Sequence, residues 1–149
     1  MNTLANRGMN QPMHSIIAPS VADAAALVGR ILLAVLFLKS GWGKIGGFGE
    51  TAAMMASKGV PLATIALVVT IVIELGAGVL LVIGYKARWA ALALALWLIP
   101  VTLTFHNYWA VPPEQVMAQS TNFFKNLSIF GGMLILFAFG PGRYSLDRQ

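Results

Sequence analysis

Four long apolar segments constrain the fold of this chain more than any other feature. They cover residues 23–44, 62–84, 87–106 and 122–140. A helix of about 20 residues rises about 30 Å, which is the thickness of the hydrocarbon core of a bilayer. Strands in lipid would leave unpaired edges unless they closed into a barrel. The sequence therefore predicts an all-α integral membrane protein, a bundle of four spanning helices.

The composition agrees with a single membrane domain. The chain is 58% hydrophobic and only 10% charged, whereas an ordinary soluble domain carries about 25% charged residues. We expect a polar N-terminal tail at 1–20, the membrane domain at 21–142 and a short C-terminal tail at 143–149. The N-terminal tail lacks the apolar core of a signal peptide, so we expect it to be retained.

The basic residues predict the orientation in the membrane. The net charge is +5, and the cations gather in the two tails and the loop between the second and third segments: Arg7, Lys86, Arg88, Arg143 and Arg148. The positive-inside rule then places both termini in the cytoplasm, in a bacterial inner membrane. The positive net charge is thus explained by the membrane topology and by contact with anionic lipids, so no nucleic-acid partner is expected.

The loops on the opposite side each predict a short helix at the membrane interface. Residues 50–58 can form two amphipathic turns. A second short helix is expected from Pro113, because proline is favoured in the first turn of a helix. The tight turn at 85–88 makes the second and third spanning helices antiparallel neighbours.

Two charged residues inside the spans predict a buried polar core. A carboxylate at the centre of a spanning segment is costly and usually faces a partner or a water-filled cavity. If the first helix ends level with the start of the second, Arg30 and Glu74 lie about 21 Å and about 18 Å from that end. We therefore predict an Arg30–Glu74 ion pair, either structural or at the floor of a ligand cavity.

A second polar layer is expected near the outer surface. Lys44 shares a helix face with Arg30, whereas Lys39 points away and is expected to snorkel to the interface. The other members of the layer are His106, Asn107, Trp109, Lys125 and Asn126. One interpretation is an aromatic belt with a snorkelling lysine. The other is a pocket whose histidine, lysine and amides bind a quinone carbonyl and exchange a proton.

Several other chemistries lack the residues they need. The chain has no cysteine and two histidines, of which His14 lies in the N-terminal tail. We therefore expect no iron–sulfur cluster, no bis-histidine haem within one bundle and no metal site. Phosphate-binding and serine-nucleophile motifs are also absent. No catalytic residue is assigned, and no covalently bound cofactor is expected.

The order of short motifs resembles the DoxX family of small bacterial membrane proteins. The motifs are Gly29-Arg30, Ser40-Gly41-Trp42-Gly43-Lys44, Gly59-Val60-Pro61, Glu74-Leu75-Gly76-Ala77, His106-Asn107-Tyr108-Trp109, Lys125-Asn126-Leu127-Ser128 and Gly131-Gly132. The resemblance implies a four-helix membrane fold with recurring polar positions at Arg30, Lys44, Glu74, His106, Lys125 and Asn126. It also implies a link to quinone oxidoreductases, in which this chain would be an accessory subunit.

Three functions remain open at this point. The first is a quinone-linked accessory subunit, the second a non-enzymatic binding or transport protein for a small amphiphile, and the third a structural membrane subunit. A homo-oligomer or larger complex is expected in each case, because four short helices bury little surface. The alanine-rich third segment, with Ala87, Ala91 and Ala95, offers a contact face.

Overall fold

The predicted fold class is confirmed by a computed structural model, which describes residues 18–147. The elements are α1 (Pro19–Gly46), α2 (Phe48–Ser57), α3 (Ala63–Ile83), α4 (Ala87–Phe105), the 3₁₀ helix η1 (Tyr108–Ala110) and α5 (Pro113–Phe139). The described part of the chain contains no strand. Four helices are long and apolar enough to cross a membrane: α1, α3, α5 and the α4 region. Most of the predicted N-terminal tail, including Arg7 and His14, and Arg148 lie outside the described residues.

The ends of α3 and α4 lie within one residue of their predicted bounds, as does the end of α5, but α5 begins at Pro113 and not at the predicted residue 122. The short outer helix and the span predicted to begin at residue 122 form one continuous helix from Pro113. Pro113 lies in the first turn, where its missing N–H is tolerated. No proline or glycine follows until Gly131, so nothing interrupts the helix at residue 122. The first outer loop does contain its own short helix, α2.

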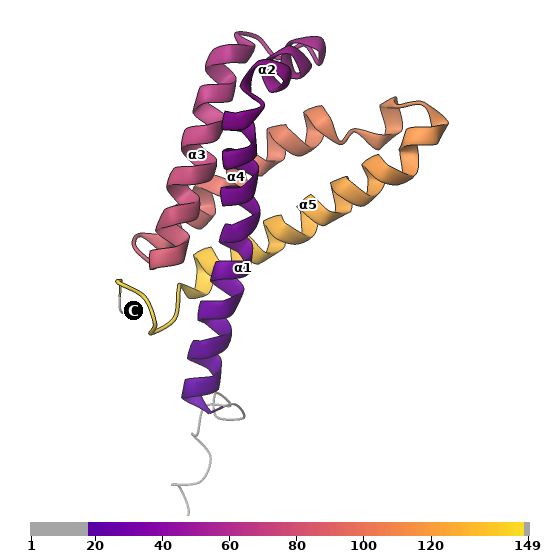
Figure 1. Cartoon of the computed structure of the whole chain (residues 1–149). Coiled ribbons are helices and arrows are strands. Elements are labelled where there is room, and N and C mark those ends of the chain that lie inside the picture. Colours follow the sequence, from indigo (N-terminus) through magenta and orange to yellow (C-terminus); the bar gives the residue numbers. More distant parts are fainter. Residues whose placement is uncertain (1–17, 148–149) are drawn as a thin grey trace, which may run out of the picture.

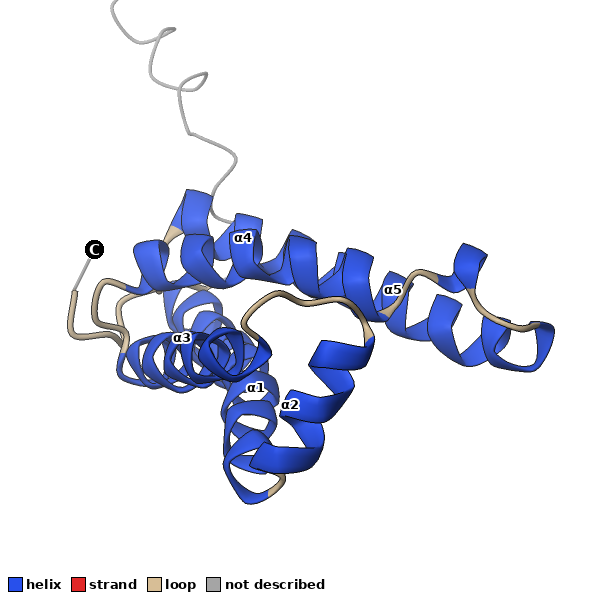
Figure 2. Ribbon diagram, turned by 90° about the horizontal axis from the view of Figure 1, so that it is seen from above, coloured by secondary structure: helices blue, strands red, loops and turns tan. Residues whose placement is uncertain are grey.

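The four long helices form two antiparallel hairpins. α1 packs mainly against α3, and α4 packs mainly against α5 (Figure 1). The α4–α5 pair lies at a steep angle to the α1–α3 pair (Figure 2). α2 packs against α3 and α1 at one end of the bundle, which we call the α2 end. The opposite end carries the α3–α4 turn and the segment that follows α5.

Small residues let α1 approach α3 closely. A Cβ atom added at Gly41 would lie 2.8 Å from Leu75, and one added at Gly78 would lie 2.8 Å from Leu38. Such positions are a common means of helix association in lipid, where close backbone approach provides packing. The seam fixes the register of the first hairpin, with Gly41 opposite Glu74.

The alanine stripe of α4 is used inside the chain. Ala87, Ala91 and Ala95 are fully buried in the core formed by the chain's own helices. Contrary to the prediction, this stripe therefore offers no contact face to another subunit. An oligomer remains a prediction, but it would need a different surface.

The segment after α5 folds back over the α3–α4 turn. The backbone N–H groups of Leu146 and Asp147 donate to the carbonyls of Ile83 and Gly84. The Asp147 carboxylate accepts a hydrogen bond from the Ala87 N–H at the start of α4, where a helix has unpaired donors and favours negative charge. Gly84 has a φ of 69°, and an added Cβ would lie 2.5 Å from Ser145. The segment thus closes this end of the bundle.

Arg30 holds this closing segment and does not pair with Glu74, so the predicted ion pair is wrong. Arg30 is 2% exposed, and its guanidinium donates to the carbonyls of Pro141 at 2.8 Å, Tyr144 at 2.8 Å and Val82 at 3.3 Å. The prediction assumed that α1 and α3 end at the same height. The register at Gly41 instead lets α3 extend past the end of α1 by about 9 Å, and α2 packs beside this part.

Candidate functional site

A cavity of about 640 Å³ lies between the two hairpins at the α2 end. Its volume is within the range of sites that bind small molecules. All five α-helices contribute to its wall. The apolar part includes Phe37, Met55, Trp97 and Phe105. The polar part holds five of the eight predicted site and core residues: Lys44, Glu74, His106, Lys125 and Asn126.

The pairing of Glu74 with Lys44 forms the charged part of the wall. The Lys44 ammonium lies 3.0 Å from Oε1 and 2.9 Å from Oε2 of Glu74. It also donates to the Ser40 hydroxyl one turn earlier on α1. Glu74 is only 5% exposed. Gly41 has no side chain to crowd Glu74, so the Lys44 ammonium can reach the buried carboxylate. The contact with the Lys44 ammonium offsets part of the cost of burying the Glu74 charge.

His106 is held at the end of α4 by a residue from α5. Its Nδ1 lies 2.9 Å from Oε1 of Gln119. With that oxygen as the acceptor, Nδ1 carries the proton and Nε2 remains an acceptor. The imidazole is half-buried and forms part of the cavity wall.

Lys125 and Asn126 enter the wall from the middle of α5. The buried Asn126 amide donates to the Thr102 hydroxyl of α4 at 3.0 Å. The Lys125 ammonium donates to Oδ1 of Asn122 at 2.8 Å. Asn126 therefore joins the two helices of the second hairpin, while Lys125 has an uncharged partner.

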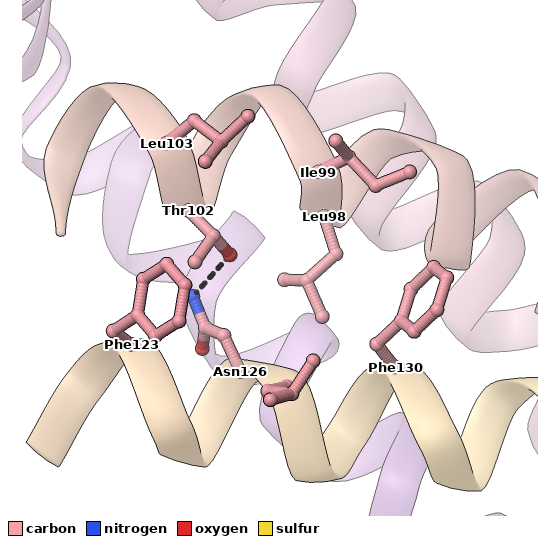
Figure 3. A pocket seen from close by; sticks show the side chains of 8 residues that line it. Leu98, Ile99, Thr102, Leu103, Phe123, Asn126 and Phe130 are labelled. Carbon is pink, nitrogen blue, oxygen red and sulfur yellow. Dashed lines mark hydrogen bonds between the residues drawn. The ribbon is translucent and has the colours of Figure 1, made fainter. Parts of the chain in front are cut away.

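A second, smaller cavity adjoins the first between α4 and α5. Its volume is about 160 Å³, and Leu98 and Asn126 belong to the walls of both cavities. Figure 3 shows the Thr102–Asn126 hydrogen bond with Phe123 beside it, and Leu98 and Phe130 between the two helices. The remaining wall is apolar, so this space suits a hydrocarbon group next to the polar cavity.

Sequence reasoning missed Trp97 and Gln119. The indole N–H of Trp97 is buried without a hydrogen-bond partner, and the residue lines the large cavity. Its sequence context, a run of alanine and leucine, gives no sign of such a role. Gln119 lies seven residues before Asn126 and therefore on the same helix face. Because the last spanning helix was predicted to begin at residue 122, Gln119 was not placed on the same helix as Asn126.

Three predicted polar or aromatic residues lie away from the cavity wall. Trp109 is 59% exposed and packs edge-to-face with Tyr108 and Phe123. This cluster fits the aromatic-belt interpretation. Asn107 has a buried Oδ1 with no partner but does not line the cavity. Arg30 is at the other end of the bundle.

The described residues contain no group of three His, Cys, Asp or Glu side chains placed to hold a metal ion. The polar groups of the cavity wall are instead ammonium, imidazole, amide, hydroxyl and indole groups with one carboxylate. Such a set recognises a molecule through hydrogen bonds and charge. Its apolar surroundings favour a ligand that is itself partly hydrocarbon.

Membrane-length helices that surround one polar cavity place the protein among small polytopic membrane proteins. The chain belongs to the DoxX family, which it matches over residues 25–107. That region contains Arg30, Lys44, Glu74 and His106 but excludes α5.

Two similar proteins come from Escherichia coli strain K12. The inner membrane protein YqjF is 40% identical over 126 residues, which cover 85% of this chain and 92% of YqjF. The inner membrane protein YphA is 35% identical over 123 residues, covering 83% and 88% of the two chains. The names of both accord with the predicted inner-membrane location.

A more distant similarity extends to a eukaryotic protein. The surfeit locus protein 4 homolog of Schizosaccharomyces pombe is 31% identical over 125 residues, covering 83% of this chain but 36% of that protein. No solved structure matches the chain.

Proposed function

We propose that this protein binds a quinone or quinol in the large cavity and acts as a docking subunit for a membrane oxidoreductase. The observation that supports the proposal is the convergence of His106, Lys125 and the Glu74–Lys44 pair on one cavity with aromatic walls. In this proposal the electron-carrying cofactor belongs to a partner subunit. The DoxX resemblance provides the link to quinone chemistry.

The cavity has hydrogen-bonding groups that suit a quinone head group. A quinone ring is flat and apolar and has carbonyl oxygens that accept hydrogen bonds. The Trp97 indole N–H is buried in the wall without an acceptor, and Lys125 has donors beyond the one that Asn122 uses. A bound quinone would supply electron and proton transfer within the membrane. His106 would offer its Nε2 as a hydrogen-bond acceptor to a hydroxyl group of the bound quinol.

The cavity also reaches the lipid-facing surface of the protein. Leu36 in α1 and Pro100 in α4 line the cavity and are exposed. Both lie well inside spanning helices, so this opening faces the side of the bundle. A lateral opening lets an amphiphile enter from the bilayer while its tail stays in hydrocarbon.

The proposal is tested by identifying what copurifies with the protein. The protein is purified in native nanodiscs, and bound small molecules are extracted and measured by mass spectrometry. Near-stoichiometric quinone is expected in the wild type, with lower occupancy in His106→Ala and Glu74→Gln. Lys39→Gln is a matched control, because Lys39 is exposed on α1 and does not line the cavity. Phospholipid alone, in equal amounts in all variants, would contradict the proposal.

A second candidate is non-enzymatic binding or transport of a small amphiphile. The favouring observation is that the polar cavity adjoins an apolar one, an arrangement that suits a head group and a tail without requiring redox chemistry. Stoichiometric copurification of a non-quinone amphiphile, lost in His106→Ala, would favour this candidate over quinone docking.

A further inference from the structure

We infer that the ligand of the large cavity carries an acidic head group whose anion pairs with Lys125. The inference deepens the proposed function and rests on it, since the ligand occupies the same cavity. It concerns the charge of the head group, which the proposal leaves open.

The charges in the cavity wall do not balance. The wall holds the ammonium groups of Lys44, Lys58 and Lys125, and its one carboxylate belongs to Glu74. Lys44 contacts both oxygens of that carboxylate. Lys58 caps the end of α2 and is exposed there, at the end of the bundle, where water is accessible. The Lys125 side chain is also exposed, but it lies on the spanning helix α5, away from the end of the bundle, and no carboxylate of the wall balances its charge.

Lys125 lies within the membrane-spanning part of α5. Lys125 precedes Phe139, the last residue of the helix, by 14 positions, which corresponds to about 21 Å along the axis. A hydrocarbon core is about 30 Å thick, so Lys125 lies inside that thickness when the Phe139 end meets the bilayer surface. Its hydrogen-bond partner is the neutral Asn122 amide. An ammonium group in this setting is costly unless an anion accompanies it.

The neighbouring polar groups also favour an anion. The Trp97 indole N–H is a donor without an acceptor. The Asn126 amide is already bonded to Thr102, and the Glu74 carboxylate is already paired. Lys125 thus keeps unused donors for a ligand, and the one carboxylate of the wall is occupied. An ionised oxygen accepts hydrogen bonds more strongly than a neutral carbonyl.

The test compares two probes that differ in charge. The first is a hydroxynaphthoquinone with an alkyl chain, whose enol is ionised at neutral pH, and the second is its neutral O-methyl ether. Binding is measured in phosphatidylcholine nanodiscs for wild type, Lys125→Gln, Lys125→Arg and the control Lys39→Gln. Each affinity is corrected for the partitioning of that probe into protein-free nanodiscs of the same lipid.

We expect wild type and Lys39→Gln to bind the anionic probe about tenfold or more tightly than the ether, as for a charge-assisted hydrogen bond. Lys125→Gln should lose that preference, and Lys125→Arg should keep most of it. If the preference for the anionic probe is lost in Lys125→Gln but kept in Lys125→Arg, it depends on the positive charge and does not result from a packing defect.

Two results would overturn the inference. Equal binding of both probes to the wild type would contradict the acidic head group but leave quinone binding intact. An anion preference that survives Lys125→Gln would show that Lys125 snorkels and does not face the ligand. Displacement of the anionic probe by phosphatidylglycerol in the nanodisc would support the acidic head group, but it would assign the site to a lipid and contradict the quinone of the proposed function. Absence of binding by either probe would instead contradict the proposed function.

Discussion

At the scale of single residues, the two buried charged residues, Glu74 and Arg30, have different partners at opposite ends of the bundle. Glu74 contacts Lys44 in the cavity wall, whereas Arg30 contacts three backbone carbonyls at the other end of the bundle. Removing one partner of a buried pair leaves the other charge uncompensated, which costs more than removing both. The two residues can therefore be tested separately.

Glu74→Gln should lower the free energy of unfolding by about 2 kcal/mol, less than for a fully buried pair because Lys44 is partly exposed. The double variant Glu74→Gln/Lys44→Met should recover much of this loss, since no unpaired ammonium remains. A double-mutant cycle from equilibrium unfolding in detergent measures the coupling. Additive losses would show that the pair contributes nothing to stability.

Arg30→Gln should release the C-terminal segment without disturbing the cavity. The variant loses charge-assisted hydrogen bonds that are each worth about 1.5–3 kcal/mol. Trypsin should then cleave faster after Arg143, whose exposed side chain lies in the segment that Arg30 holds. Ligand binding should stay within about twofold of the wild type. Lys39→Gln controls for charge, and lost binding with unchanged cleavage would contradict the clamp.

At the scale of elements, the packing of α1 on α3 depends on glycine at selected positions. Gly78 faces Leu38 across the seam, whereas an atom added at Gly76, two residues earlier in the same helix, meets nothing within 4 Å. The two glycines share a helix but differ in surroundings. They therefore provide a matched pair for testing the seam.

Gly78→Val should lower the free energy of unfolding by about 2 kcal/mol, because the added atoms force Leu38 or the helices to move. Gly76→Val should change it by less than about 0.5 kcal/mol, as expected for a site without close neighbours. Thermal unfolding in detergent compares the two variants with wild type. Equal destabilisation would mean that valine acts through helix propensity and not through the seam.

At the scale of the whole molecule, four spans place the start of α1 and the segment after α5 on the same side of the membrane. The exposed Lys86 and Arg143 lie at that end, as does Arg88. The positive-inside rule assigns it to the cytoplasm. The α2 end, with the mouth of the polar cavity, would then face the periplasm.

This orientation can be measured because the chain has no cysteine of its own. Ser57→Cys places a thiol at the α2 end, and Tyr85→Cys places one in the α3–α4 turn; both positions are exposed. A membrane-impermeant maleimide should label the first in intact cells and the second only after permeabilisation. The reverse pattern would invert the predicted topology.

The sequence alone determined the helices and most of the residues of the polar site. Membrane-length apolar segments leave few alternatives to helix, so the bounds of α3 and α4 could be read closely. Charged residues inside those segments are costly enough to mark the site, as Glu74, Lys44 and Lys125 do. Both features, the apolar length and the interrupting charges, can be read from a single segment and the lipid that surrounds it.

Only the tertiary structure decided which polar residues meet. The partner of Glu74 depends on the register of α1 against α3, which the contacts of Gly41 and Gly78 set. Arg30 and Lys44 lie 14 residues apart on α1, about 21 Å along the axis, so this register decides which of them meets Glu74. The return of the C-terminal segment to Arg30 and the approach of Gln119 to His106 also join distant parts of the chain. Such contacts arise from packing between elements, because the pattern within one helix specifies its face and not its neighbour.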